Sequence, residues 1–161
     1  MGLPVLSRSF DQQLIFQFFW KFSAMECALK RSGFLQEKVW ADADWNKFAA
    51  KIGSNTNAGI SPDFDKAIAK LIELSPQRQT QIKGQLGWKH VARTAKDTDV
   101  TYAITLLKTA RNNLFHGGKF PGGLQAEVAR DHQILRAALA ILDGCYDLCP
   151  EIHRTVEEVA A

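Results

Sequence analysis

The sequence predicts an all-α fold, a helical bundle with long first and fifth helices. Apolar residues recur at helical spacing along nearly all of the 161 residues, and no convincing pair of alternating strands is visible. Glycine and proline lie between the periodic stretches, where they mark helix ends. With 46% apolar and 23% charged residues, the chain has the composition of one ordinary globular domain.

The first predicted helix spans about residues 8–32. Ser9 or Asp11 can cap its start, and Gly33 lies just beyond its end. Most of its sides are apolar, which indicates a helix buried all round, either by the fold or by a second subunit.

Shorter elements follow the first helix. In order, we expect a helix at 44–52, an exposed loop at 53–59, a helix at 62–74 with Ser61 as its cap and Pro62 in its first turn, a short helix from 76 to about 84 or 87, and a loop or frayed helix at 89–99.

Two longer helices complete the predicted bundle. One covers about residues 98–115 and ends at the glycine pair 117–118, and the other covers about residues 125–148. Pro150 starts a short tail helix. The whole chain, 1–161, is therefore predicted to be a single domain with its core at about 9–148 and a C-terminal helical tail at 149–161.

Positive charge is concentrated in one part of the chain. Residues 76–119 contain eight basic and two acidic residues and carry +6, whereas the whole chain carries +3. A basic segment on a near-neutral body favours an anionic partner, although a solvated helical surface gives the same pattern.

The sequence also indicates a compartment. Its longest apolar stretch, residues 14–20, is far too short to cross a bilayer, and no signal peptide is visible at the N-terminus. Three cysteines, an odd number, argue against a disulfide framework. We therefore expect a cytoplasmic protein without a membrane partner.

Two charged residues lie on otherwise apolar helix faces. Arg111 falls within the stripe of the helix at 98–115, and Glu26 falls within that of the first helix. A guanidinium keeps its charge, so burial demands a partner. The pattern predicts a Glu26–Arg111 ion pair or a polar cleft lined by both, and a pair that only fixes packing remains an alternative.

Residues next to Arg111 at this helix end have side chains suited to proton transfer and to binding a phosphate. Asn112 and His116 lie four positions apart and share a helix face beside Arg111. A histidine with an unperturbed pKa of about 6.5 is suited to proton transfer near neutrality, and an arginine stabilises charge that develops on a phosphoryl group. The trio fits cleavage of RNA by attack of its own 2′-hydroxyl, which needs no metal and no cofactor.

The segment Arg111-Asn-Asn-Leu-Phe-His-Gly-Gly-Lys119 resembles the R-x4–6-H motif of the HEPN superfamily, in the form found in its Apea-like and small plasmid-borne groups. Arg111 and His116 match the two defining positions, and Asn112 matches the usual polar position. The first helix is similar to the early helix of that family, with Glu26 as the polar residue brought to the motif and Lys30 beside it. The resemblance covers about residues 9–148.

This resemblance implies a HEPN-like bundle with metal-independent endoribonuclease activity, in a homodimer whose two motifs meet across a symmetric cleft. Members of the family act as toxins, in phage defence or in RNA processing, so an antitoxin or regulatory partner is also implied. Arg111, Asn112 and His116 would be catalytic, with Glu26 holding Arg111. The alternatives are a non-catalytic HEPN-like module that binds RNA, nucleotide or a protein, and an unrelated helical scaffold.

Further basic and aromatic residues are candidate RNA contacts. Lys119 follows the glycine pair, Lys108 lies one turn before Arg111, and Trp88, Lys89 and Arg93 interleave an aromatic ring with positive charge. Packing of Trp88 against the bundle is the alternative.

A cysteine–histidine group at the end of the chain has a more ordinary interpretation. Cys145, Cys149 and His153 are spaced by fours, but they offer only three ligands and the two thiols follow an apolar stripe. We therefore expect core thiols, Cys27 included, and no metal site.

Overall fold

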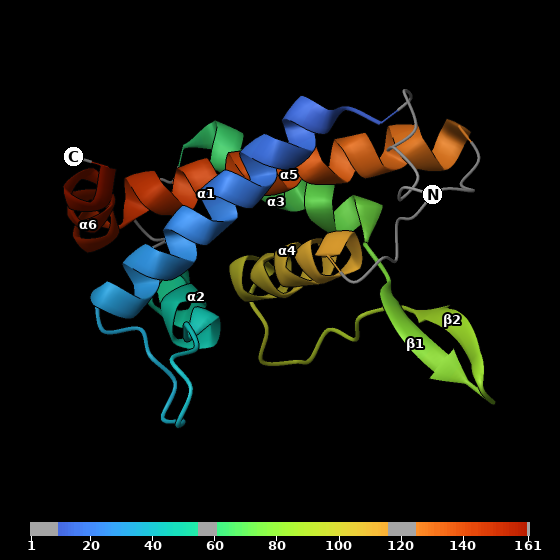
Figure 1. Ribbon diagram of the computed structural model, residues 1–161, viewed down its shortest axis with the longest axis horizontal. Helices are drawn as coiled ribbons and strands as arrows, with labels where there is room; N and C mark the ends of the chain where they lie inside the picture. The colour runs from blue at the N-terminus through green and yellow to red at the C-terminus, as the bar shows by residue number, and fades with distance from the viewer. Residues whose placement is uncertain (1–9, 55–60, 116–124, 161) are drawn as a thin grey trace, which may run out of the picture.

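The computed structural model describes residues 10–54, 61–115 and 125–160, and most of them are helical (Figure 1). The elements are α1 (Gln12–Arg31), α2 (Trp45–Ser54), α3 (Pro62–Leu74), β1 (Arg78–Ile82), β2 (Gln85–Lys89), α4 (Asp99–Phe115), α5 (Gln125–Leu148) and α6 (Pro150–Ala160). The expected helical bundle, with a long first and a long fifth helix, is confirmed, and a small β-hairpin accompanies it.

The long helix α5 packs mainly against α1 and α3 (Figure 1). On the other side of α3 lies α4, and α2 covers α4 near the C-terminal end of α1. The tail helix α6 packs against α1 and α5. The core between these helices is apolar, and its largest fully buried side chains include Phe18, Trp45 and Phe48.

Local sequence signals set several helix ends. At the start of α1, the carboxylate of Asp11 accepts a hydrogen bond from the Leu14 amide at 3.0 Å. Ser61 caps α3 in the same way through the amide of Asp63. These side chains satisfy amides that have no partner inside the helix. Gly33 follows α1 with φ of 84°, a conformation that glycine adopts without strain.

The hairpin replaces the short helix expected after Pro76. Strands β1 and β2 are antiparallel and are joined by a two-residue turn in which Lys83 and Gly84 both have positive φ, 51° and 80°. Such a turn matches the twist of paired strands. The prediction of a helix here, and of no strand pair, was wrong because the glutamines of this stretch hide its alternation.

The first helix is not buried all round as expected. Phe16 and Trp20 are 63% and 65% exposed, and Phe19 is 42% exposed. The three side chains are spaced three and four positions apart, so they share one face of α1. The rest of the helix carries a buried stripe that includes Phe18 and Phe22.

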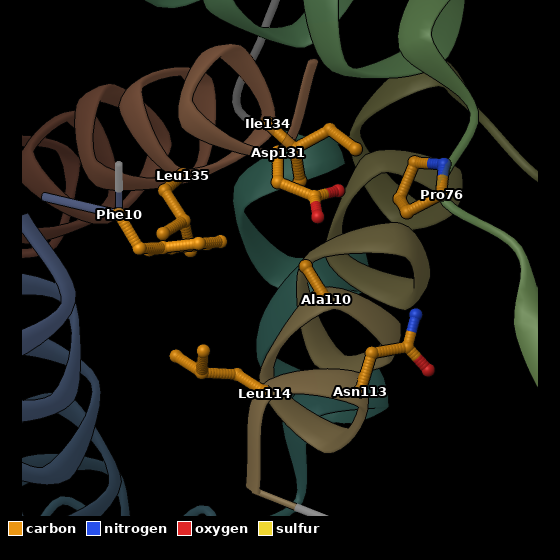
Figure 2. A pocket seen from close by; sticks show the side chains of 8 residues that line it. All are labelled: Phe10, Pro76, Ala110, Asn113, Leu114, Asp131, Ile134 and Leu135. Atoms are coloured by element: carbon orange, nitrogen blue, oxygen red, sulfur yellow. The ribbon is translucent and has the colours of Figure 1, made fainter. Parts of the chain in front are cut away.

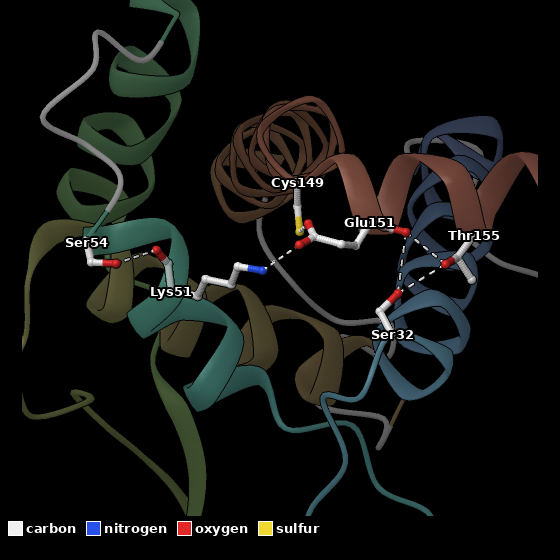
Figure 3. Close-up of polar contacts among 6 residues, drawn as sticks. All are labelled: Ser32, Lys51, Ser54, Cys149, Glu151 and Thr155. Carbon is white, nitrogen blue, oxygen red and sulfur yellow. Dashed lines mark hydrogen bonds and ion pairs between the residues drawn. The ribbon is translucent and has the colours of Figure 1, made fainter.

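Polar contacts join the tail helix to the rest of the molecule (Figure 3). The Glu151 carboxylate accepts a hydrogen bond from Lys51 of α2 at 2.9 Å and one from the thiol of Cys149 at 3.1 Å. Ser32, after α1, lies 3.1 Å from the hydroxyl of Thr155. Within the described residues, no helix is long and apolar enough to span a membrane.

Candidate functional site

Arg111 lies near the C-terminal end of α4, half-buried between aromatic rings. Its guanidinium carbon is 5.5 Å from the ring centre of Phe22 and 5.2 Å from that of Phe115. One of its nitrogens, Nη1, donates a hydrogen bond to Oδ1 of Asn112 at 3.1 Å. Ring faces attract a guanidinium and tolerate its partial burial.

The expected Glu26–Arg111 ion pair is absent, and within the described residues Arg111 pairs with no carboxylate. Glu26 instead accepts a hydrogen bond from the indole nitrogen of Trp45 at 3.2 Å. The helical projection correctly placed both charges on inward-turned faces, but it does not report which neighbour each face meets. Trp45 also stacks on Phe22. The partner of Glu26 therefore comes from α2, whereas the sequence pattern had expected it from the helix that carries Arg111.

Lys108, one turn before Arg111 on α4, interacts electrostatically with Glu26. Burial lowers the pKa of its ammonium group, while the nearby carboxylates of Glu26 and Asp44 raise it and the positive charge of Arg78 lowers it further. Two cations therefore follow each other along one side of α4. Lys30, one turn beyond Glu26, is half-buried and forms no ion pair with a described residue.

The predicted catalytic trio is described only in part. Arg111 and Asn112 lie side by side, and the Asn112 side chain is exposed. His116 and Lys119 lie outside the described residues. The described part of α4 ends at Phe115, directly before His116.

The predicted RNA contacts after Pro76 lie in two places, strand β2 and the loop before α4. Trp88 and Lys89 lie on β2, and Trp88 is 41% exposed. Arg93 lies in the loop before α4, where it is paired with the carboxylate of Asp99 and stands over the ring of Tyr102 at 5.4 Å. Its contacts fix this loop to the start of α4.

Two side chains that the sequence analysis missed hold the hairpin to α4. The buried amide of Asn113 donates to the backbone carbonyl of Gln77 at 2.7 Å, and the hydroxyl of Tyr102 donates to that of Val91 at 2.9 Å. A polar residue directly after Asn112, on the face opposite the solvent, was the available signal for the first contact.

An exposed aromatic face adjoins Arg111. Phe115 of α4 is 45% exposed and lies 5.4 Å, centre to centre, from the ring of Phe19. Together with Phe16 and Trp20, these residues form a surface that we call the aromatic face. An apolar cluster of this kind on a protein surface is typical of an interaction site.

Two cavities in the described part of the chain have none of the predicted site residues in their lining. One cavity, of about 20 Å³, lies on the inner side of α4. Figure 2 shows that Ala110 and Leu114 of α4 face Leu135 of α5 there. This cavity has room for about one water molecule and none for a nucleotide. A larger hollow of about 520 Å³ lies between α1 and α5 and contains none of the predicted site residues.

Cys145 and Cys149 are core thiols, as expected, whereas Cys27 is only half-buried. Burial raises the pKa of both core thiols, which keeps them protonated and poor as nucleophiles. No three of the described histidine, cysteine and acidic residues are grouped so that they hold a metal ion. His153 instead lies against the ring of Tyr146.

Comparison with known proteins adds no assignment: no protein-family model, no curated protein and no solved structure matches this chain.

Proposed function

We propose that this protein is a metal-independent endoribonuclease of the HEPN type, with Arg111, Asn112 and His116 as its catalytic residues. The observation that carries the proposal is the state of Arg111. Its guanidinium is half-buried, held by two aromatic rings, and not neutralised by any described carboxylate. A cation in this state retains its capacity to bind a phosphate.

The proposed reaction is a transesterification within the RNA chain. The 2′-oxygen attacks the adjacent phosphorus, and the bond from phosphorus to the 5′-oxygen breaks. The 2′-hydroxyl loses a proton and the leaving 5′-oxygen gains one, and His116 performs one of these two transfers as general base or general acid. Arg111 stabilises the charge on the phosphoryl oxygens, and Asn112 orients the phosphate. The products are a 2′,3′-cyclic phosphate and a free 5′-hydroxyl.

Neighbouring charge supports a polyanionic substrate. Lys108 lies one turn from Arg111. Glu26, which the sequence pattern had paired with Arg111, accepts a hydrogen bond from Trp45 instead. A phosphate at this helix end therefore meets positive charge from two successive turns of α4.

We further propose that the active form is a homodimer in which a second copy covers the aromatic face. Phe19 and Phe115 of that face touch each other, and Phe115 also touches Arg111. A two-fold axis through such a surface brings two Arg111 side chains toward one cleft. Activity of this kind fits a toxin or phage-defence effector in the cytoplasm that is controlled by an antitoxin or regulatory partner.

The test is incubation of purified protein with total RNA and transfer RNA in the presence of a chelator, followed by analysis of the new RNA ends. We expect the wild type to produce 2′,3′-cyclic phosphate ends. Arg111→Ala and His116→Ala should abolish cleavage and keep the helical circular dichroism of the wild type. Lys66→Ala, on the exposed side of α3, is the matched control and should cleave normally.

Unchanged cleavage by His116→Ala would end the assignment of this residue. Binding of RNA without cleavage would replace the proposal by the non-catalytic alternative, in which the same cations only hold the polynucleotide.

A further inference from the structure

The β-hairpin is an exposed arm with no part in the core. Figure 1 shows it projecting away from the helices, beyond the end of α3. Its apolar side chains Ile82, Leu86 and Trp88 are 50%, 79% and 41% exposed. A two-stranded hairpin is at best marginally stable alone. Hydrogen bonds from Asn113 and Tyr102 fasten the chain to α4 at the two ends of the hairpin.

The strand register gives the hairpin two different faces. Gln79 pairs with Trp88 and Gln81 with Leu86, so amides, an indole and an aliphatic side chain share the first face. The same face continues past the strands, where the side chain of Gln77 meets the ring of His90 at 3.0 Å.

The second face and the turn carry positive charge. Arg78 pairs with Lys89 on this face, and Lys83 occupies the turn. Residues 74–96 contain five basic and no acidic residues. Two paired strands lie only about 5 Å apart. Arginine and lysine side chains on one face are long enough to extend to the edges of such a ribbon, where the phosphates of a polynucleotide laid on the other face would run.

The arm is continuous with the proposed catalytic site. Asn113, which binds the Gln77 carbonyl directly before β1, belongs to the same turn of α4 as Arg111, although the two side chains leave the helix on different sides. Arg78, at the base of β1, is close enough to Lys108 to lower the pKa of its ammonium group. Positive charge thus extends from the turn of the hairpin, along its base, to the end of α4.

We propose that the hairpin is a single-strand-binding arm and that the substrate of the enzyme is unpaired RNA, with bases on the face of Trp88 and Leu86 and phosphates held by Arg78, Lys83 and Lys89. The ligand being RNA rests on the proposed function. Unpaired bases expose the faces on which aromatic side chains stack, and glutamine amides bond to their exposed edges. The predominance of positive charge favours this polyanion over a protein partner.

Binding can be measured apart from cleavage. The probe is a fluorescein-labelled RNA of about 12 nucleotides, within the range that single-strand sites cover, with every 2′-hydroxyl methylated to prevent transesterification. We expect fluorescence anisotropy to show tighter binding to this strand than to the matching duplex. Trp88→Ala should weaken binding about tenfold, Trp88→Phe should retain most of it, and Lys89→Ala should lower the salt slope by about one.

Trp40→Ala is the matched control, because Trp40 is a more exposed tryptophan of the segment between α1 and α2. Circular dichroism confirms the helices of each variant. The inference is overturned if the strand is not bound, if Trp88→Ala binds like the wild type, if Trp40→Ala loses as much, or if the duplex or an acidic peptide binds as tightly.

The two proposals fail in different ways. If the wild type cleaves native RNA and Trp88→Ala cleaves it equally well at limiting substrate, the hairpin is not the arm and the ribonuclease stands. If no RNA is cleaved but Trp88→Ala still loses affinity for the strand, the catalytic proposal falls and the arm stands.

Discussion

Gly144 of α5 faces the ring of Phe64 in α3, where these two helices pack together. A Cβ atom placed on Gly144 would lie 2.1 Å from Cδ2 of that ring and 2.9 Å from two further ring atoms. Carbon atoms do not approach so closely, so Gly144→Ala forces either the ring or one of the two helices to move.

The expected loss of stability follows from two opposing effects. Overpacking of a core costs about 1–3 kcal/mol, and a clash with a ring enclosed between two helices belongs at the upper end. Alanine in place of glycine inside a helix stabilises the folded protein by about 1 kcal/mol through its higher helix propensity. We therefore expect Gly144→Ala to lower the free energy of unfolding by about 2 kcal/mol and the melting temperature by about 4–8 °C.

Thermal and urea unfolding followed by circular dichroism measure this loss. The matched control is Gly53→Ala in α2, where the new Cβ meets its nearest neighbour at 3.4 Å, an ordinary contact. It should raise stability by about 0.5 kcal/mol. In a Phe64→Leu background, Gly144→Ala should cost at least 1 kcal/mol less than in the wild type. A Gly144→Ala variant as stable as the wild type would refute the reasoning.

Three further perturbations test other parts of the structure. The hydrogen bond from Lys51 is the main cause that lowers the pKa of the Glu151 carboxyl from 4.5 to about 2. The stabilisation from this carboxylate should therefore be complete above pH 4.5 and be lost as the pH falls toward 2. Because both groups are exposed, the loss in unfolding free energy should be at most about 1 kcal/mol. Glu151→Gln should remove this dependence of the unfolding free energy on pH. Asn113→Ala removes the bond to the Gln77 carbonyl and should cost about 1–3 kcal/mol, with faster hydrogen exchange in the hairpin than in the helices. Trp20→Glu places a charge on the aromatic face and should convert a dimer to a monomer in sedimentation experiments.

Each of these three has a distinct contrary result. The same acid dependence in Glu151→Gln and wild type would exclude this carboxyl as its source. Uniformly faster exchange after Asn113→Ala would assign the bond to global stability and not to the hairpin. A wild-type protein that sediments as a monomer, or a Trp20→Glu variant that remains a dimer, would contradict the proposed interface.

The helices were predictable where a local signal sets an end. Ser61 and Pro62 define the start of α3, and the structure begins that helix at Pro62. The helix expected at about residues 125–148 is observed as Gln125–Leu148, because its apolar periodicity is long and uninterrupted.

The hairpin was missed because its outward faces are mostly polar, so burial does not impose an apolar alternation on them. The sequence still contained a signal: Lys83 and Gly84 form a two-residue connection between segments that carry Thr80, Ile82 and Trp88. Side chains preferred in strands on either side of a glycine turn would have predicted the strand pair.

The partners of Glu26 and Arg111 could not be predicted for a different reason. Projection onto a helix gives the side on which a residue lies, but the neighbour on that side depends on how the helices are rotated and arranged. In the structure, Trp45 of α2 donates a hydrogen bond to Glu26, and Arg111 lies against the rings of Phe22 and Phe115.

The two contacts that fix the hairpin require a fixed distance along α4 between the residues that make them. Tyr102 and Asn113 are eleven residues apart, which is about three turns, so their side chains leave the helix within about 20° of one direction and about 16 Å from each other. Insertion of a single residue between them would turn one contact away from the other by about 100° and leave one end of the hairpin detached. The spacing of this stretch is therefore constrained twice, by the core that its buried residues join and by an element outside the bundle.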